Sequence, residues 1–398
     1  MNDLNSLYCR PLSADERARL ARGLADHRAG TAGQLMQRAL EAEALRGLGT
    51  AAAPVAAFIE KLLALAATDR EAFRRRIEHW TVTFYLQQIL ARRGREEDAL
   101  RLADRLVDPP AAWDAHPKVS GLDAPVVPLA ALGLPKDWAP PPAADDRAWL
   151  PLAESLARAR ATLEVLWPEV LAWARIMVPA YVDQGAPPDR NTHYSSSTGC
   201  GSPVFLGRAT DAFRHAEDLV HELQHSRFYL LVPAAAFGSL SREDARYVSP
   251  YRTDPRPLRG LLLGVHAFLA VNELRLRALR SGRVGAVDRR TLLKTHRMNL
   301  FTFATLARHE AVAPEGAPLF AALGAALAGQ HDEIEAAADD ETKQRFDHGL
   351  VEHVARVRRA SSAPLENVSA SYRDWAEIVA LAAERGAAGG AGRVDRAS

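Results

Sequence analysis

An H-E-x-x-H motif at residues 221–225 lies in a segment with a helical pattern. Asp211 can cap the start of this helix, and no proline interrupts it before Pro233. Its apolar residues recur at helical spacing: Phe213, Ala216, Leu219, Val220, Leu223 and Phe228. Two histidines four positions apart lie on one face of a helix, so the ring nitrogens of His221 and His225 can bind one divalent metal. Glu222 is then placed to act on whatever else the metal holds.

Size and charge exclude several classes of protein. The chain has 398 residues, 48% of them hydrophobic, and a formal net charge of +1. This balance gives no global attraction to nucleic acid or to a membrane surface. Only Cys9 and Cys200 occur, which suits a reducing compartment. The N-terminus lacks a signal-peptide pattern, and we find no uninterrupted apolar run of about 18 residues. We therefore expect a cytoplasmic protein without a membrane span.

The pattern divides the chain into four parts. Residues 1–107 form a helical N-terminal region, in which Ser13 and Glu16 fit a capping box. Residues 108–146 are rich in proline, which forbids long helices and predicts a linker. Residues 147–385 form the H-E-x-x-H metal-binding domain with catalytic residues. Residues 386–398 are mostly Gly, Ala and Arg and are predicted to be a disordered tail.

The short strands are expected between residues 180 and 207. Tyr181-Val182, His193–Ser197 and Ser202–Leu206 are brief runs, the last two separated by glycines. The prediction is a mostly α fold, with a small β-sheet preceding a zincin-like helix. This last step rests on fold analogy.

A catalytic metal needs a third protein ligand, with positions left open for substrate. A second apolar helix begins at Leu258 and offers two candidates, Glu273 and His266, which share one face of it. Glu273 would complete either a zinc peptidase set or the two-His, one-carboxylate set that holds non-haem Fe(II). The alternatives are a core histidine at 266 and a surface carboxylate at 273 that pairs with Arg277.

Three stretches of the chain resemble a known family. They are LVHELQHS at 219–226, SPYRxDPRPLxGLL at 249–262 and GVHAFLAV at 264–271. They resemble the H-E-x-x-H proteins encoded beside ribosomally made, post-translationally modified peptides in bacteria, regarded as iron- and 2-oxoglutarate-dependent peptide β-hydroxylases. The resemblance covers about a quarter of the chain. Some relatives carry histidine where Phe268 stands, which leaves the third ligand open between His266 and Glu273.

The resemblance implies a dioxygenase of natural-product biosynthesis whose substrate is a precursor peptide. Its cofactors would be Fe(II) and 2-oxoglutarate, and an arginine would pair with the distal carboxylate of the keto acid. Arg252 and Arg256 lie in the loop before the second helix and are the candidates for this cation. The serines at 195–197 are further candidates to hydrogen-bond substrate, although serine-rich loops are common.

Glu222 separates the hydroxylase from the main alternative. In a zinc metallopeptidase it would be the general base that takes a proton from metal-bound water. In an oxygenase it would orient a ligand or a bound water. A third interpretation is a helical binding protein with an inert metal pair. The peptide substrate and the oligomeric state are not encoded in any motif.

Overall fold

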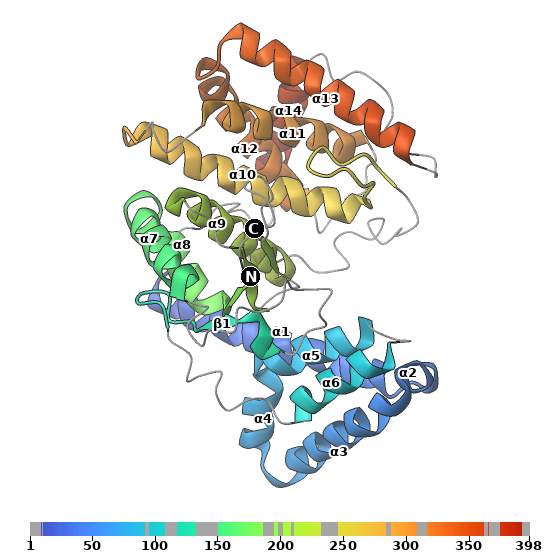
Figure 1. Cartoon of the computed structure of the whole chain (residues 1–398). Coiled ribbons are helices and arrows are strands. Elements are labelled where there is room, and N and C mark those ends of the chain that lie inside the picture. Colours follow the sequence, from blue (N-terminus) through green and yellow to red (C-terminus); the bar gives the residue numbers. More distant parts are fainter. Residues whose placement is uncertain are drawn as a thin grey trace. The chain divides into compact units, whose positions relative to one another are not determined.

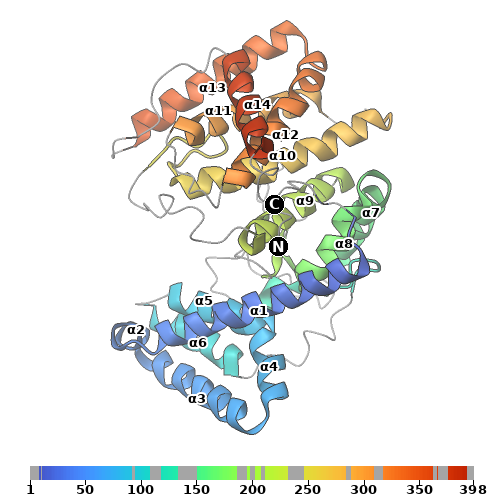
Figure 2. The ribbon, with the colours of Figure 1, turned by 180° about the vertical axis from the view of Figure 1, so that it is seen from behind.

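The computed structural model describes residues 9, 11–91, 95–107, 118–132, 150–185, 195–197, 202–207, 211–231, 246–283, 288–308, 317–361, 365 and 375–391 (Figures 1 and 2). The described chain divides into two compact units. The N-terminal unit holds residues 11–230, and the C-terminal unit holds Cys9 and the residues from Leu231 onward. The fold is mostly α with a small sheet, which confirms the predicted fold class.

Helices fill the first part of the N-terminal unit. They are α1 (Ala14–Ala39), α2 (Ala42–Leu48), the 3-10 turn η1 (Gly49–Ala51), α3 (Ala52–Thr68), α4 (Arg70–Glu78), α5 (Trp80–Ala91) and α6 (Glu96–Val107). Ser13 and Glu16 form the predicted capping box: the Ser13 hydroxyl accepts the Glu16 N–H, and the Glu16 carboxylate accepts the Ser13 N–H. Asp69 caps α4 in a similar way, accepting from two backbone N–H groups.

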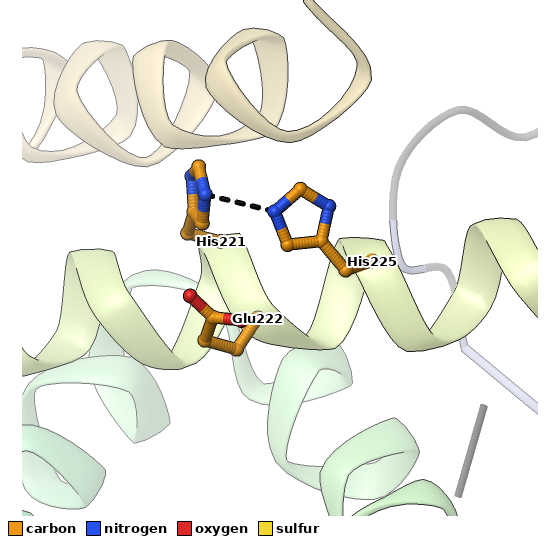
Figure 3. A group of neighbouring side chains, drawn as sticks. All are labelled: His221, Glu222 and His225. Carbon is orange, nitrogen blue, oxygen red and sulfur yellow. Dashed lines mark hydrogen bonds between the residues drawn. The ribbon is translucent and has the colours of Figure 1, made fainter. Parts of the chain in front are cut away.

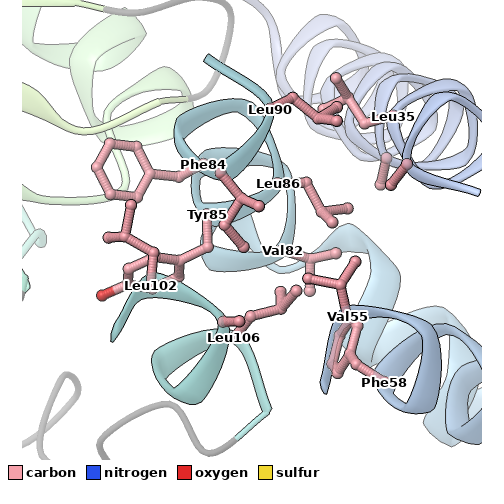
Figure 4. Close-up of a cluster of buried hydrophobic side chains, with 14 of the residues drawn as sticks. Leu35, Val55, Phe58, Val82, Phe84, Tyr85, Leu86, Leu90, Leu102 and Leu106 are labelled. Atoms are coloured by element: carbon pink, nitrogen blue, oxygen red, sulfur yellow. The ribbon is translucent and has the colours of Figure 1, made fainter. Parts of the chain in front are cut away.

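The hydrophobic core of this unit surrounds α5 (Figure 4). Almost every side chain of α5 is buried, including Val82, Phe84, Tyr85 and Leu86. A helix whose side chains are almost all buried must be enclosed by other elements. Here α1, α4 and α6 pack around it.

One helical segment, Arg46–Thr68, is long and apolar enough to cross a membrane, although the sequence predicted no span. This is weak evidence, because core helices of soluble proteins pass the same test of length and composition. The α3 side chains Val55, Phe58, Ile59 and Leu62 lie in the core just described. One apolar face of α3 therefore packs within the N-terminal unit.

A four-stranded sheet follows the helices in the same unit. The strands are β1 (Val126–Pro128), β2 (Tyr181–Asp183), β3 (Ser195–Ser197) and β4 (Val204–Leu206), in the order β1-β2-β4-β3. The first three in this order run parallel, and β3 is antiparallel to β4. Val127, Val182 and Phe205 lie in register, and all three belong to the core cluster around α5. The sheet and the helices therefore share one core.

The prediction of a linker at 108–146 is corrected for its described part, residues 118–132. This part contains β1 and the 3-10 turn η2 (Leu129–Leu132), and its residues Val126, Val127 and Leu132 are buried. Proline forbids a long helix, but Pro128 is compatible with an edge strand, where a missing N–H breaks no interior ladder. Residues 108–117 and 133–146 lie outside the described residues.

Two helices connect β1 to β2: α7 (Leu150–Leu166) and α8 (Pro168–Met177). The two helices are separated at Trp167, and Pro168 lies in the first turn of α8. Trp167 and Trp173 are buried.

The C-terminal unit is helical. It contains α10 (Leu258–Arg280), α11 (Arg289–Arg308), α12 (Ala317–Ala336), α13 (Asp340–Ala360) and α14 (Trp375–Ala391). Figures 1 and 2 show α12 and α14 side by side, and a Cβ at Gly324 would collide with the backbone of Ala382. The predicted disordered tail is corrected at residues 386–391, which continue α14, while residues 392–398 lie outside the described residues. The described units also divide near residue 231, inside the predicted 147–385 domain.

Candidate metal centre

The H-E-x-x-H motif lies on α9 (Ala212–Leu231), the last helix of the N-terminal unit. Asp211 precedes it, and its carboxylate accepts the backbone N–H of Phe213, as the sequence predicted. The predicted apolar residues are buried: Phe213, Ala216, Leu219, Val220, Leu223 and Phe228. The helical context of the motif is therefore confirmed, and the two histidines themselves are partly exposed.

His221 and His225 point their Nε2 atoms at each other. These two atoms lie 3.0 Å apart, and the rings stand at 86° to one another (Figure 3). Two metal–nitrogen bonds of about 2.05 Å place their nitrogens about 2.9 Å apart at a right angle and about 3.3 Å apart at the tetrahedral angle. The observed separation thus matches two ligands of one metal ion. An N–H···N hydrogen bond between the rings would have the same length.

Burial also prepares His225 as a ligand. Removal from water lowers the pKa of His225 to about 4, so the ring is neutral at pH 7. Metals bind the neutral imidazole through its lone pair. The donor set and its spacing therefore fit a divalent ion such as Zn(II) or Fe(II).

Glu222 projects from another side of α9 than the two imidazoles, as Figure 3 shows, and is almost completely buried. One of its carboxylate oxygens and one nitrogen from each histidine all lie within 4.8 Å of one another. A carboxylate at this distance can act on a molecule held by the metal, either as a base or as a hydrogen-bond acceptor.

His215 fixes the start of α9, and the sequence analysis missed it. Its Nε2 lies 2.7 Å from the carbonyl oxygen of Gly207, which can only accept, so Nε2 donates. In the neutral ring Nδ1 then accepts the hydroxyl proton of Ser155 on α7, at 2.5 Å. This buried side chain of α9 thereby contacts both α7 and the residue that follows β4. A histidine six positions before the motif was the available signal.

We expect the substitution His215→Ala to destabilise the protein by about 1–3 kcal/mol, because it leaves a buried carbonyl and a buried hydroxyl without their partner. Urea unfolding followed by circular dichroism measures the change. The control is His348→Ala, since His348 is mostly exposed. Equal stability of the two variants would contradict the anchoring role of His215.

Arg227 is a second residue that sequence reasoning missed. Its guanidinium lies 4.4 Å from the ring centre of Trp173 on α8 and donates to the Gln224 side chain at 2.8 Å. It is completely buried, so these contacts hold the turn after His225 against α8.

The two candidate third ligands, His266 and Glu273, lie on α10 in the C-terminal unit. Glu273 Oε1 lies 2.9 Å from Arg277 Nε, the predicted i,i+4 partner, and 3.4 Å from Arg280 Nη1. Glu273 is buried, however, and is not the surface carboxylate of that alternative. His266 is buried within α10. Neither residue belongs to the unit that carries His221 and His225, so the third ligand stays a prediction.

Arg252 and Arg256 converge on one carboxylate. Their Nε atoms each lie 2.8 Å from an oxygen of Asp254. Burial raises the pKa of Asp254, but the hydrogen bond from Arg252 and the charges of both arginines more than offset this and hold the pKa below its ordinary value. The two predicted cations are therefore together in the C-terminal unit, already paired with an internal anion. The serines at 195–197 form β3, and their side chains lie outside the described residues.

The sequence stretches at 249–262 and 264–271 also pack on each other. The Tyr251 ring stacks on Phe268 with centroids 4.8 Å apart, and its hydroxyl donates to Asn299 at 2.7 Å. A Cβ at Gly264 would collide with the Tyr251 ring. Glycine at 264 thus allows the loop that carries Arg252 to lie flat against α10.

No protein-family model matches the chain, and no curated protein matches it at a significant level of sequence similarity. The function must therefore be argued from the residues of the site.

Proposed function

We propose that the protein is an iron- and 2-oxoglutarate-dependent β-hydroxylase of a side chain in a ribosomally made precursor peptide. The observation that carries the metal part is the 3.0 Å separation of the His221 and His225 Nε2 atoms on a buried helix. The choice of chemistry rests on the resemblance of the three sequence stretches at 219–226, 249–262 and 264–271. The localisation that goes with it, cytoplasmic, is part of the same proposal.

In this function His221 and His225 hold the iron, with Glu273 or His266 as third ligand. When bound, iron with 2-oxoglutarate and O₂ supplies the oxidation: one oxygen atom enters a C–H bond of the peptide, the other enters succinate, and CO₂ leaves. Arg252 or Arg256 pairs with the distal carboxylate of 2-oxoglutarate, in exchange for part of its contact with Asp254. Glu222 accepts a hydrogen bond from a water or a ligand beside the metal.

A second candidate function is zinc-dependent peptide hydrolysis. The burial of Glu222 and its closeness to the histidine nitrogens favour it, because a desolvated carboxylate beside metal-bound water is a suitable general base. In that case the reaction needs neither 2-oxoglutarate nor O₂.

An anaerobic titration of the apoprotein decides between these functions. Fe(II) is added first and 2-oxoglutarate second, and visible absorption is recorded. We expect a metal-to-ligand charge-transfer band that saturates at one 2-oxoglutarate per protein. The absence of this band, together with zinc retained through purification and cleavage of peptides, would overturn the hydroxylase and support the peptidase.

A further inference from the structure

A second group of metal-binding side chains lies in the C-terminal unit. His296 on α11 faces His331 and Glu335 on the neighbouring helix α12. One ligand atom from each residue lies within 4.8 Å of the other two. His331 and Glu335 are four positions apart and therefore lie on one face of α12.

The spacing of the two imidazoles matches that of the motif on α9. His296 Nε2 and His331 Nδ1 are 3.1 Å apart, between the roughly 2.9 and 3.3 Å expected for two nitrogens on one metal ion. The residues come from two helices rather than from one turn, so a bound ion would link α11 to α12.

The burial of His296 is hard to explain by one hydrogen bond. Its side chain is completely buried, and its Nδ1 has no hydrogen-bond partner among the described residues. An orphaned buried nitrogen costs more free energy than one N–H···N bond returns. A metal–nitrogen bond at Nε2 would give this buried ring a stronger partner than its single contact with His331.

Glu335 can serve as the third ligand while it keeps its present contacts. Its Oε1 lies 2.8 Å from Arg297 Nη1, and Lys343 Nζ lies 3.8 Å from Oε2. A carboxylate has about four lone-pair positions, so one remains for a metal. Arg297 also lies 3.1 Å from Asp347, which offsets its charge. Hydrogen bonds of this kind orient carboxylate ligands in metal sites.

We propose that His296, His331 and Glu335 form a second site for a divalent transition metal, separate from His221 and His225, which joins α11 to α12. Two nitrogens and one carboxylate oxygen suit Zn(II) or Co(II). His331 and Glu335 are partly exposed, which leaves the fourth position to water and gives the ion a route of entry.

The test uses the full chain with both motif histidines replaced, His221→Ala with His225→Ala. Co(II) is titrated into this protein and followed by visible absorption, and bound zinc is counted separately by elemental analysis. We expect one equivalent of either metal and a higher unfolding temperature with Zn(II). Adding His331→Ala should weaken binding more than about 100-fold and abolish the temperature shift. No binding by a folded double variant would overturn the proposal.

Glu335→Gln is a second test variant, for the case that His331→Ala does not fold. It keeps the shape of the side chain and a contact for Arg297. It should weaken Co(II) binding at least about tenfold, with unchanged circular dichroism. His348→Ala on α13 is the control and should bind as the parent does. Unchanged binding in both the His331 and Glu335 variants would also overturn the site. The 2-oxoglutarate band separates this proposal from the proposed function. The band should persist when His331→Ala is the only substitution in the chain, and it should vanish in His221→Ala.

Discussion

Replacing His221 by alanine should abolish both the 2-oxoglutarate charge-transfer band and turnover. The variant removes one of two nitrogens that lie 3.0 Å apart and face a common point. Loss of a residue that only orients a ligand typically weakens metal binding 10- to 100-fold, so loss of a ligand itself should exceed about 100-fold. Iron binding is measured anaerobically, and His225→Ala should behave in the same way.

The control is His348→Ala, which removes an imidazole that is mostly exposed and lies beside Glu352. It should leave the band unchanged. If His221→Ala and His225→Ala also keep the band, the motif is an inert pair, and a helical binding protein becomes the better interpretation. Glu222→Gln gives an independent result: an oxygenase should keep its iron and its band, whereas a peptidase should lose about 100-fold or more in turnover.

Helix α9 could be predicted from the sequence because its signals are local. The spacing of the apolar residues, the cap at Asp211 and the i,i+4 histidines all depend on neighbours within a few turns, and each is found in the structure. The strands at 181–183 and 204–206 were predicted for the same reason.

The features that were missed depend on residues far apart in the chain. His215 bonds to Ser155 across 60 positions, and His296 meets His331 across 35. A window of 20 residues shows that such a histidine is present, as His215 is before the motif, but it does not show which distant residue the histidine meets. Strand β1 was missed because proline dominated the pattern of 108–146, and only its pairing with β2 at Val127 and Val182 makes that segment a strand. The domain boundaries stay predictions where they fall outside the described residues.

Phe205 carries the largest expected effect on stability. It is fully buried at the centre of β4, lies 6.0 Å from the Phe84 ring and ties the sheet to the core around α5. Since β4 leads through Gly207 to His215 and α9, this packing also supports α9.

The substitution Phe205→Ala should lower the free energy of unfolding by about 3–5 kcal/mol. For a unit of this size, that lowers the unfolding temperature by roughly 6–20 °C, as measured by calorimetry. The control Val165→Ala truncates an exposed side chain on α7 and should change little. Similar effects in the two variants would mean that β4 is not part of the core, and the position of α9 would need another cause.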